Sequence, residues 1–335
     1  MPGYIKAGVL GDVSDVLAQM NTQAGGLSNG ILEAETLDGK QWGIPYQLWA
    51  DAIYVRKDLL DAKGLQPPKT YDDMAKIAVA VSDPKTPIYG WGMMLSQACS
   101  SDSVADFQSI LWSFGGSAWS QDGKTVTLNS PETMKAIEFI KGVWDAGGIA
   151  PDAVNWDCYG NNAAYLNGTA AMIKNAGSVY NAMKANDPDL LSKTIIVPDP
   201  AGPAAQLNYT SYEPGFLSSA SKETEIAKKF LLWLYDPARQ LEYMHMMAGF
   251  NFPVYKDHAK DAMWEDPGLK AFLESSVNSK TGGYPGPTTA WQLEAERQGV
   301  YQVMLGKILI DKMDPAKAVD QAVAALEQIR DSMSK

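Results

Sequence analysis

The sequence predicts an α/β protein in which short apolar strands alternate with longer amphipathic helices. Its 335 residues, 46% of them hydrophobic, are enough for two domains with a large buried core. Two runs of strand type, 43–47 and 52–56, flank a more polar stretch. Helical spacing of apolar residues then begins at 70–81 and recurs to the end of the chain. These observations together favour the α/β class over an all-helical or all-strand fold.

The helix expected over 70–81 has the clearest start signal in the first half. Pro67 and Pro68 interrupt the chain, and Thr70 then caps the helix, with Asp73 at the spacing of a capping box. The other elements expected in this half are a helix over 10–20, strands over 43–47, 52–56 and 88–94, and a helix over 104–114.

In the middle of the chain, an alternating segment at 125–128 predicts a strand that follows a turn. Ser130 then caps a helix with Pro131 at its first position, and glycines 147–148 end it. A helix over 161–166 and strands over 170–173 and 194–197 are expected next.

Three helices are expected near the end of the chain. Ser221 caps the first, whose predicted buried face consists of Ile226, Phe230, Leu231 and Leu234. A second helix restarts at Asp236-Pro237 and ends at Gly249. The last begins at Asp314-Pro315 and has its core stripe at Val319, Val323, Leu326 and Ile329.

Charge and hydropathy exclude several classes of function. The formal net charge is −11 and the chain has four arginines, whereas binding to nucleic acid or to an anionic membrane draws on Lys and Arg. No run of 18 apolar residues predicts a membrane span, and residues 1–6 show no apolar leader segment. We therefore expect no nucleic-acid partner.

No cofactor or metal site is expected. Cys99 and Cys158 are 59 residues apart and form no zinc-type pair; they form either one disulfide or two buried thiols. The sequence also has no P-loop, no dinucleotide-binding glycine motif and no Gly-x-Ser-x-Gly elbow.

Several spaced segments resemble those of the extracellular solute-binding proteins of family 1, which serve sugar-type ABC importers and include maltose-binding proteins. Their order and spacing cover nearly the whole chain, although each segment alone is a weak signal. The matching segments are Asp38 to Tyr46, Tyr54 to Asp58, Pro67 to Thr70, Phe114 to Gly116, Asn129 to Glu132, Asn167 to Met172, Pro198 to Pro203 and Ser221 to Leu234.

The resemblance implies a two-lobe periplasmic binding protein of type II, with hinge strands and a ligand cleft between the lobes. It implies that lobe one holds residues 1–52 and 216–280, and that lobe two holds 53–215 and 281–335. Family members have some sixty or more residues before the part that matches Tyr4 to Leu10, so the first lobe is expected to be incomplete. The expected location is periplasmic or extracellular and membrane-associated.

The function implied is capture of a sugar or oligosaccharide and its delivery to the permease subunits of an ABC importer by hinge closure. A sugar offers apolar ring faces and many hydroxyls, so aromatic and polar side chains near the crossovers are candidates. Trp291 occupies a place that resembles the stacking Trp of maltose-binding proteins, with a packing role at the start of a helix as the alternative. Trp49 precedes the first crossover in a polar context; its alternative is a core position.

Asp51 and Glu213 flank the two crossovers, where carboxylates accept strong hydrogen bonds from hydroxyls. The alternative is a salt bridge between lobes or a helix cap. Tyr212, beside Glu213, is a candidate to cover a sugar ring. Further candidates are Gln97, Trp156, Asn161, Asn175, Gly177 and Asn251, of which Trp156 and Asn161 could instead cap a helix and Asn251 could form a turn.

Two alternative functions stay open at this point. Asp51 and Glu213 could imitate the carboxylate pair of a glycoside-cleaving enzyme. A polyol, a polyamine or another small solute could replace the sugar, since aromatic side chains also hold cations.

Overall fold

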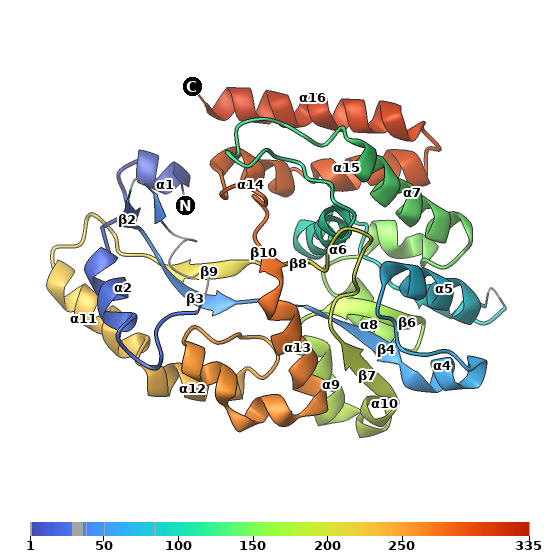
Figure 1. The fold of residues 1–335 in the computed structure, drawn as a ribbon, viewed down its shortest axis with the longest axis horizontal. Helices are drawn as coiled ribbons and strands as arrows, with labels where there is room; N and C mark the ends of the chain where they lie inside the picture. The colour runs from blue at the N-terminus through green and yellow to red at the C-terminus, as the bar shows by residue number, and fades with distance from the viewer. Residues whose placement is uncertain (1, 29–35, 38, 50, 84, 335) are drawn as a thin grey trace.

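The computed structural model describes residues 2–28, 36–37, 39–49, 51–83 and 85–334 (Figure 1). Helices and short strands alternate along these residues, as expected for the α/β class. Asp38, the first residue of a segment that carries the family resemblance, and Ala50, just before the first crossover, lie outside the described residues.

The helices and strands fall into three successive parts of the chain. The first part contains α1 (Pro2–Lys6), α2 (Ser14–Met20), β1 (Thr36–Leu37), β2 (Lys40–Gln41), β3 (Ile44–Leu48), β4 (Ala52–Arg56), α4 (Lys57–Lys63) and α5 (Tyr71–Val81). The middle part contains β5 (Tyr89–Trp91), α6 (Ser100–Ser113), α7 (Pro131–Asp145), η1 (Pro151–Asn155), α8 (Gly160–Leu166), β6 (Ala170–Asn175), α9 (Ser178–Asn186), α10 (Pro188–Ser192), β7 (Thr194–Val197), β8 (Asn208–Tyr209) and β9 (Tyr212–Gly215). The last part contains α11 (Thr224–Leu234), α12 (Pro237–Met246), η2 (Lys256–Lys260), η3 (Ala262–Glu265), α13 (Pro267–Val277), β10 (Ser279–Lys280), α14 (Ala290–Arg297), α15 (Val300–Leu309) and α16 (Pro315–Met333).

A four-stranded sheet in the order β5-β6-β4-β7 forms the centre of what we call the larger body, which consists of this sheet and the helices packed around it, α4 to α10 and α13 to α16. β4 runs antiparallel to both β6 and β7, so that Tyr54 lies opposite Ile173 on one side and Ile196 on the other. β6 is buried along its whole length, because helices cover both faces of this sheet. In Figure 1, α16 lies along one edge of the same body, beside α14 and α15.

A two-stranded sheet connects this body to the N-terminal part of the molecule. β3 pairs with β9 in antiparallel fashion, with Ile44 opposite Gly215 and Leu48 opposite Tyr212. β3 then leads into β4, while β8 pairs in parallel with β10 just before β9 begins. The chain therefore passes twice between the two sheets, near the two predicted crossovers.

Among the described residues, the buried apolar side chains form three clusters. The smallest lies beside β3 and includes Val16, Leu17 and Leu217. A second cluster joins Tyr54 and Ile173 of the central sheet to Phe272 of α13, and the largest covers the remainder of the sheet and the C-terminal helices. Part of the segment 216–280 thus shares a core with β4 and β7, although the resemblance assigns that segment to lobe one. The lobe boundaries remain a prediction.

The strand expected over 125–128 is absent. These residues make a single bridge, Val126 with Trp119, and Leu128 is buried against the largest cluster. Its backbone does pair with the preceding segment, since the Thr127 N–H donates to the Ala118 carbonyl and the Ser120 N–H donates to the Thr125 carbonyl, both at 2.9 Å. The pairing is limited to this one bridge and is too short to form a strand.

The helix expected from Ser221 starts later and buries a different face. α11 begins at Thr224 after Glu223, and the structure shows no capping bond from Ser221. Ile226 and Phe230 are 63% and 55% exposed, whereas Leu231 is buried. The apolar residues of α11 occupy two sides of the helix, and only the side that carries Leu231 packs on the cluster beside β3.

Candidate functional site

A pocket of about 1160 Å³ lies between the N-terminal segment and the C-terminal helices. Its described lining comes from α1, β1, Lys124, β10, the loop 281–289 with the first turn of α14, and the end of α16. The pocket opens to solvent and is large enough for a ligand of several sugar rings.

Trp291 lines this pocket in the first turn of α14. Thr289 caps that helix, its hydroxyl accepting from the Gln292 N–H at 3.2 Å. The Trp291 indole Nε1 donates to the Gly123 carbonyl at 3.0 Å and leaves the ring half-buried. A second aromatic side chain, Tyr284, lines the same pocket and packs edge-on against Trp112. The pocket thus combines two aromatic faces with hydroxyl groups from the surrounding loop.

The residues of the first crossover lie at the junction of the two sheets. The Trp49 N–H donates to the Ser211 carbonyl at 3.0 Å, which ties the two crossovers together. The Trp49 ring meets Phe250 edge-on, with 5.6 Å between the ring centroids. On β9, Tyr212 lies opposite Leu48, and Glu213 is exposed. Trp49 is half-buried here and not a full core residue.

Asn251 follows Phe250 and is buried, with an exposed fraction of 4%. Neither its Nδ2 nor its Oδ1 has a hydrogen-bond partner among the described residues. A buried amide without partners is costly, so this position is suited to a ligand or an ordered water.

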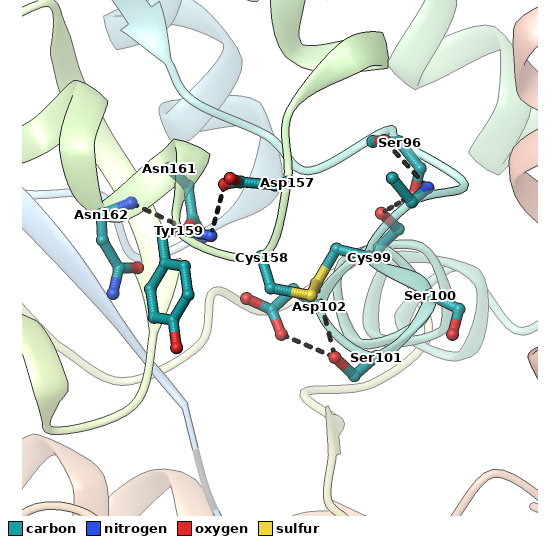
Figure 2. The surroundings of a disulfide bond; sticks show 12 residues. Ser96, Cys99, Ser100, Ser101, Asp102, Asp157, Cys158, Tyr159, Asn161 and Asn162 are labelled. Carbon is teal, nitrogen blue, oxygen red and sulfur yellow. Dashed lines mark hydrogen bonds between the residues drawn. A yellow bond between two sulfur atoms is a disulfide. The ribbon is translucent and has the colours of Figure 1, made fainter.

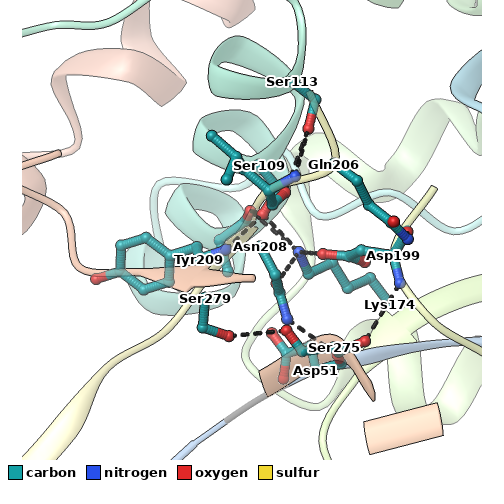
Figure 3. A network of polar contacts seen from close by, with 12 residues as sticks. Asp51, Ser109, Ser113, Lys174, Asp199, Gln206, Asn208, Tyr209, Ser275 and Ser279 are labelled. Atoms are coloured by element: carbon teal, nitrogen blue, oxygen red, sulfur yellow. Dashed lines mark hydrogen bonds and ion pairs between the residues drawn. The ribbon is translucent and has the colours of Figure 1, made fainter. Parts of the chain in front are cut away.

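A buried lysine organises the polar groups behind the first crossover (Figure 3). Lys174 Nζ, on β6, donates to Asp199 Oδ2 at 2.5 Å, to Asn208 Oδ1 at 2.8 Å and to Ser109 Oγ at 2.6 Å. Asn208 Nδ2 in turn donates to the Asp51 carbonyl at 3.2 Å. The network therefore connects the crossover to the central sheet and to α6.

Burial dominates the electrostatics of the carboxyl groups around Lys174. Loss of hydration raises the pKa of Asp51 to about 7, against the opposing effect of the Lys174 ammonium. It also raises the pKa of Asp106 and of Asp199, even though Asp199 is ion-paired with Lys174. Asp51 is thus partly protonated near neutral pH, which differs from the fully ionised acceptor that the sequence predicts.

Asn161 and Asn175 contact each other inside the larger body. Asn175 Nδ2 donates to Asn161 Oδ1 at 3.2 Å, and Asn161 Nδ2 donates to the Lys174 carbonyl at 3.1 Å. Asn175 Oδ1 accepts from Ser178 Oγ at 2.9 Å. These amides have protein partners and hold the end of β6 against the start of α8.

Gly177 makes a close backbone contact with the loop after α12. Its N–H donates to the Gly249 carbonyl at 2.8 Å, and a Cβ at this position would lie 2.4 Å from the Gly249 carbonyl carbon. This position requires glycine for lack of space, since its φ is −65°.

Trp156 and Gln97 are held near a disulfide that joins Cys99 to Cys158 (Figure 2). The bond links the loop before α6 to the loop before α8, and so decides between the two alternatives that the sequence left open. Trp156 packs against both larger apolar clusters. Gln97 is exposed and donates from Nε2 to the Gln298 carbonyl at 3.0 Å.

The predicted site residues are therefore distributed over three places. Trp291 lines the large pocket, whereas Trp49, Asp51, Tyr212, Glu213 and Asn251 lie at the crossover. Asn175 pairs with Ala52 beside the crossover and carries Asn161 with it, and Gly177 contacts Gly249, two residues before Asn251. Gln97 and Trp156 lie on the two sides of the disulfide. Sequence reasoning missed Lys174, although a lysine inside the apolar run of β6 is a signal for a buried ion pair. It also missed Lys280, at the end of β10, and Tyr284, in the next loop. The Gly-Pro turns of that loop were the signal that could have pointed to both residues.

Within the described part of the chain, no helix combines the length and apolar character that crossing a bilayer requires. The same residues contain no group of three or more His, Cys, Asp or Glu side chains arranged to hold a metal ion.

Residues 1–271 match the model of a family described as bacterial extracellular solute-binding protein. The putative ABC transporter periplasmic-binding protein YcjN of Escherichia coli is 26% identical over 268 residues, which cover 79% of this chain. The chain spans 60% of the length of that relative.

Solved structures show the same fold. An ABC transporter solute binding protein from Thermotoga lettingae, bound with α-D-tagatose, superposes with a TM-score of 0.83 at 19% identity, covering 98% of this chain and 82% of the other. Maltose-bound MalE3 of T. maritima has a TM-score of 0.79 at 23% identity, covering 96% and 81%. The predicted periplasmic-binding-protein architecture is therefore confirmed.

Proposed function

Because the chain belongs to the bacterial extracellular solute-binding proteins, we propose that it captures a saccharide and delivers it unchanged to the permease of an ABC importer. The observation that supports this most directly is the pocket of about 1160 Å³, lined by the aromatic side chains Trp291 and Tyr284. Aromatic faces bind the apolar faces of sugar rings, and the threonines of the same loop offer hydroxyls to the sugar.

The proposed mechanism is hinge closure about the two crossovers. Trp49 and Ser211 are hydrogen-bonded where the chain passes between the sheets, so a small backbone rotation there changes the distance between the two sides of the pocket. A ligand that contacts both sides of the pocket binds more tightly to the closed state than to the open state. Its binding therefore raises the population of the closed state. Small-angle scattering with and without ligand tests this, since closure reduces the radius of gyration.

Family membership favours a binding protein over the glycoside-cleaving alternative. The polyamine alternative has less support, because the described pocket lining contains Lys6, Lys124, Lys280 and Arg330. A polyol remains compatible with the aromatic and hydroxyl groups. The proposed location is periplasmic or extracellular, at the membrane that holds the permease.

A thermal-shift screen over mono- and oligosaccharides and polyols tests the binding function. A ligand at a hundred times its dissociation constant adds about 2.7 kcal/mol to the free energy of unfolding. The Trp291→Ala variant should lose at least tenfold in affinity for the best ligand, as expected for loss of an aromatic contact.

The matched control is Trp233→Ala, which removes an indole from the exposed side of α11, outside the described lining of the pocket. It should bind like the wild type. Equal affinity of the wild type and Trp291→Ala would exclude the stacking role of Trp291. A screen in which none of the compounds stabilises the protein would contradict the proposed function.

A further inference from the structure

We infer that the pocket beside Trp291 takes a saccharide that carries a carboxylate, such as a uronic acid. This inference rests on the proposed function and specifies its class of substrate. Four cationic side chains line the pocket, Lys6, Lys124, Lys280 and Arg330, and the described lining contains no Asp or Glu.

This concentration of positive charge runs against the composition of the protein. The chain has 39 acidic and 28 basic side chains, so a lining of average composition would carry more negative than positive charge. A pocket with four bases and no described acid has the opposite sign to the chain around it. It attracts an anionic ligand and disfavours a cationic one.

Three of the four cations form no ion pair with a described residue. Among the described residues, Lys6, Lys124 and Lys280 form no salt bridge. Arg330 differs, since its Nη2 lies 2.8 Å from Asp331 Oδ1 and its Nη1 donates to the Lys124 carbonyl at 3.3 Å. Lys124 nevertheless lies close enough to Asp122 to help lower the pKa of that carboxyl group. Lys6 and Lys280 therefore carry the charge that no described carboxylate compensates, and Arg330 supports the pocket wall.

Lys280 is the best placed of these lysines. Its backbone is fixed in β10, where its carbonyl accepts from the Thr210 N–H at 2.8 Å. Its side chain is half-buried, with Nζ 5.9 Å from the centroid of the Tyr284 ring. An ammonium beside an aromatic face suits a sugar acid, because the ring stacks while the carboxylate accepts a charge-assisted hydrogen bond.

The lining suits a singly charged group held by one ammonium. Arginine binds carboxylates and phosphates bidentately, but the one arginine that lines the described pocket is already paired with Asp331, which leaves Lys280 as the main point charge for a carboxylate. A neutral sugar would occupy the same space but would leave the Lys280 ammonium partly dehydrated without a new partner. The lining therefore favours the acid over its neutral parent.

The test is isothermal titration calorimetry on the whole chain. The probes are galacturonate and glucuronate, tri-galacturonate, the neutral parents galactose and glucose, maltotriose, and glucose 6-phosphate. The acidic sugars should bind at least tenfold more tightly than their neutral counterparts. Their affinity should fall as NaCl rises from 0.05 to 0.5 M, because salt screens the attraction.

The Lys280→Gln variant should weaken uronate binding roughly 10- to 100-fold, as expected for a hydrogen bond to a charged group, and should leave neutral sugars unaffected. Lys280→Arg keeps the charge and should retain most of the affinity. Lys135→Gln, on the exposed side of α7 and outside the described lining, removes the same charge and should bind like the wild type.

The outcomes separate this inference from the proposed function. Neutral sugars that bind as well as or better than the uronates would overturn the charge preference and leave the saccharide-binding function intact. Binding of glucose 6-phosphate without binding of uronates would overturn the choice of carboxylate. Absence of binding by every probe would contradict both proposals.

Discussion

At the scale of single residues, buried polar groups behind the crossover set the chemistry of this protein. Lys174 is almost completely enclosed and is stabilised by three side-chain acceptors from β8, α6 and the segment after β7. Replacing one partner would leave a buried charge unpaired, which is far more costly than losing an exposed pair. Asp51 lies at the edge of this network, and its environment favours the neutral carboxyl.

The first prediction concerns the pH dependence that Asp51 introduces. Its pKa is about 7 in the folded protein and near 3.8 in the unfolded chain, so the folded state binds more protons between these values. The contribution of Asp51 to stability is therefore fully present below about pH 4 and is lost as the pH rises through about 7. Wild type should lose more unfolding free energy between pH 5 and pH 8 than Asp51→Asn, as measured by urea denaturation.

Asp72→Asn is the control for that experiment. It removes the same charge from the exposed first turn of α5, outside the Lys174 network, and should keep the wild-type slope. Equal slopes for wild type and Asp51→Asn would show that Asp51 does not titrate in this range.

At the scale of elements, local signals located the helix starts where a cap and a partner were both present. Thr70 and Asp73 form the predicted capping box, with Asp73 N–H donating to Thr70 Oγ1 at 3.1 Å and Thr70 N–H donating to Asp73 Oδ2 at 3.0 Å. The prediction that Ser221 caps α11 was wrong. The residues from Ser221 to Thr224 are all polar, and the sequence does not show which of them precedes the first turn; in the structure it is Glu223. The disulfide also fixes the position of two elements relative to each other, because it joins the start of α6 to the loop before α8.

The second prediction concerns that disulfide. The bond closes a loop between Cys99 and Cys158, 59 residues apart, and so restricts the unfolded chain. Reduction should lower the free energy of unfolding by roughly 2–4 kcal/mol, measured by urea denaturation with and without a phosphine reductant. The exposed position of Cys158 makes the bond accessible to the reductant.

The double variant Cys99→Ser/Cys158→Ser serves as its control. It should start at the lower stability and respond no further to the reductant. A wild-type midpoint that the reductant leaves unchanged would contradict a stabilising role for the bond.

At the scale of the whole molecule, close backbone contacts determine how the parts meet. The start of α9 touches the loop after α12 through Gly177 and Gly249, and Asn181 Nδ2 donates to the Ala248 carbonyl at 2.9 Å nearby. The same loop continues to Phe250, which packs on Trp49. These contacts connect the crossover to the larger body independently of the β3–β9 pair.

The third prediction tests this contact. In Gly177→Ala the new Cβ would overlap the backbone of Gly249, so the loop must move. We expect a loss of about 1–3 kcal/mol in unfolding free energy, the usual cost of overpacking. Gly142→Ala in α7 meets no atom within 4 Å and should instead gain about 0.5–1 kcal/mol from helix propensity. Similar effects of both substitutions on the urea midpoint would show that the Gly177 contact is not tight.

The sequence by itself determined the α/β class and most helices and strands, because apolar periodicity and caps act between neighbours in the chain. Tertiary structure decided which apolar face of α11 is buried, which protein partners Asn161 and Asn175 have and how Lys174 is neutralised. Each of these depends on groups brought together from distant parts of the chain, and local pattern carries no information about them. The same holds for the charge of the pocket beside Trp291, since its cations come from segments near residues 6, 124, 280 and 330.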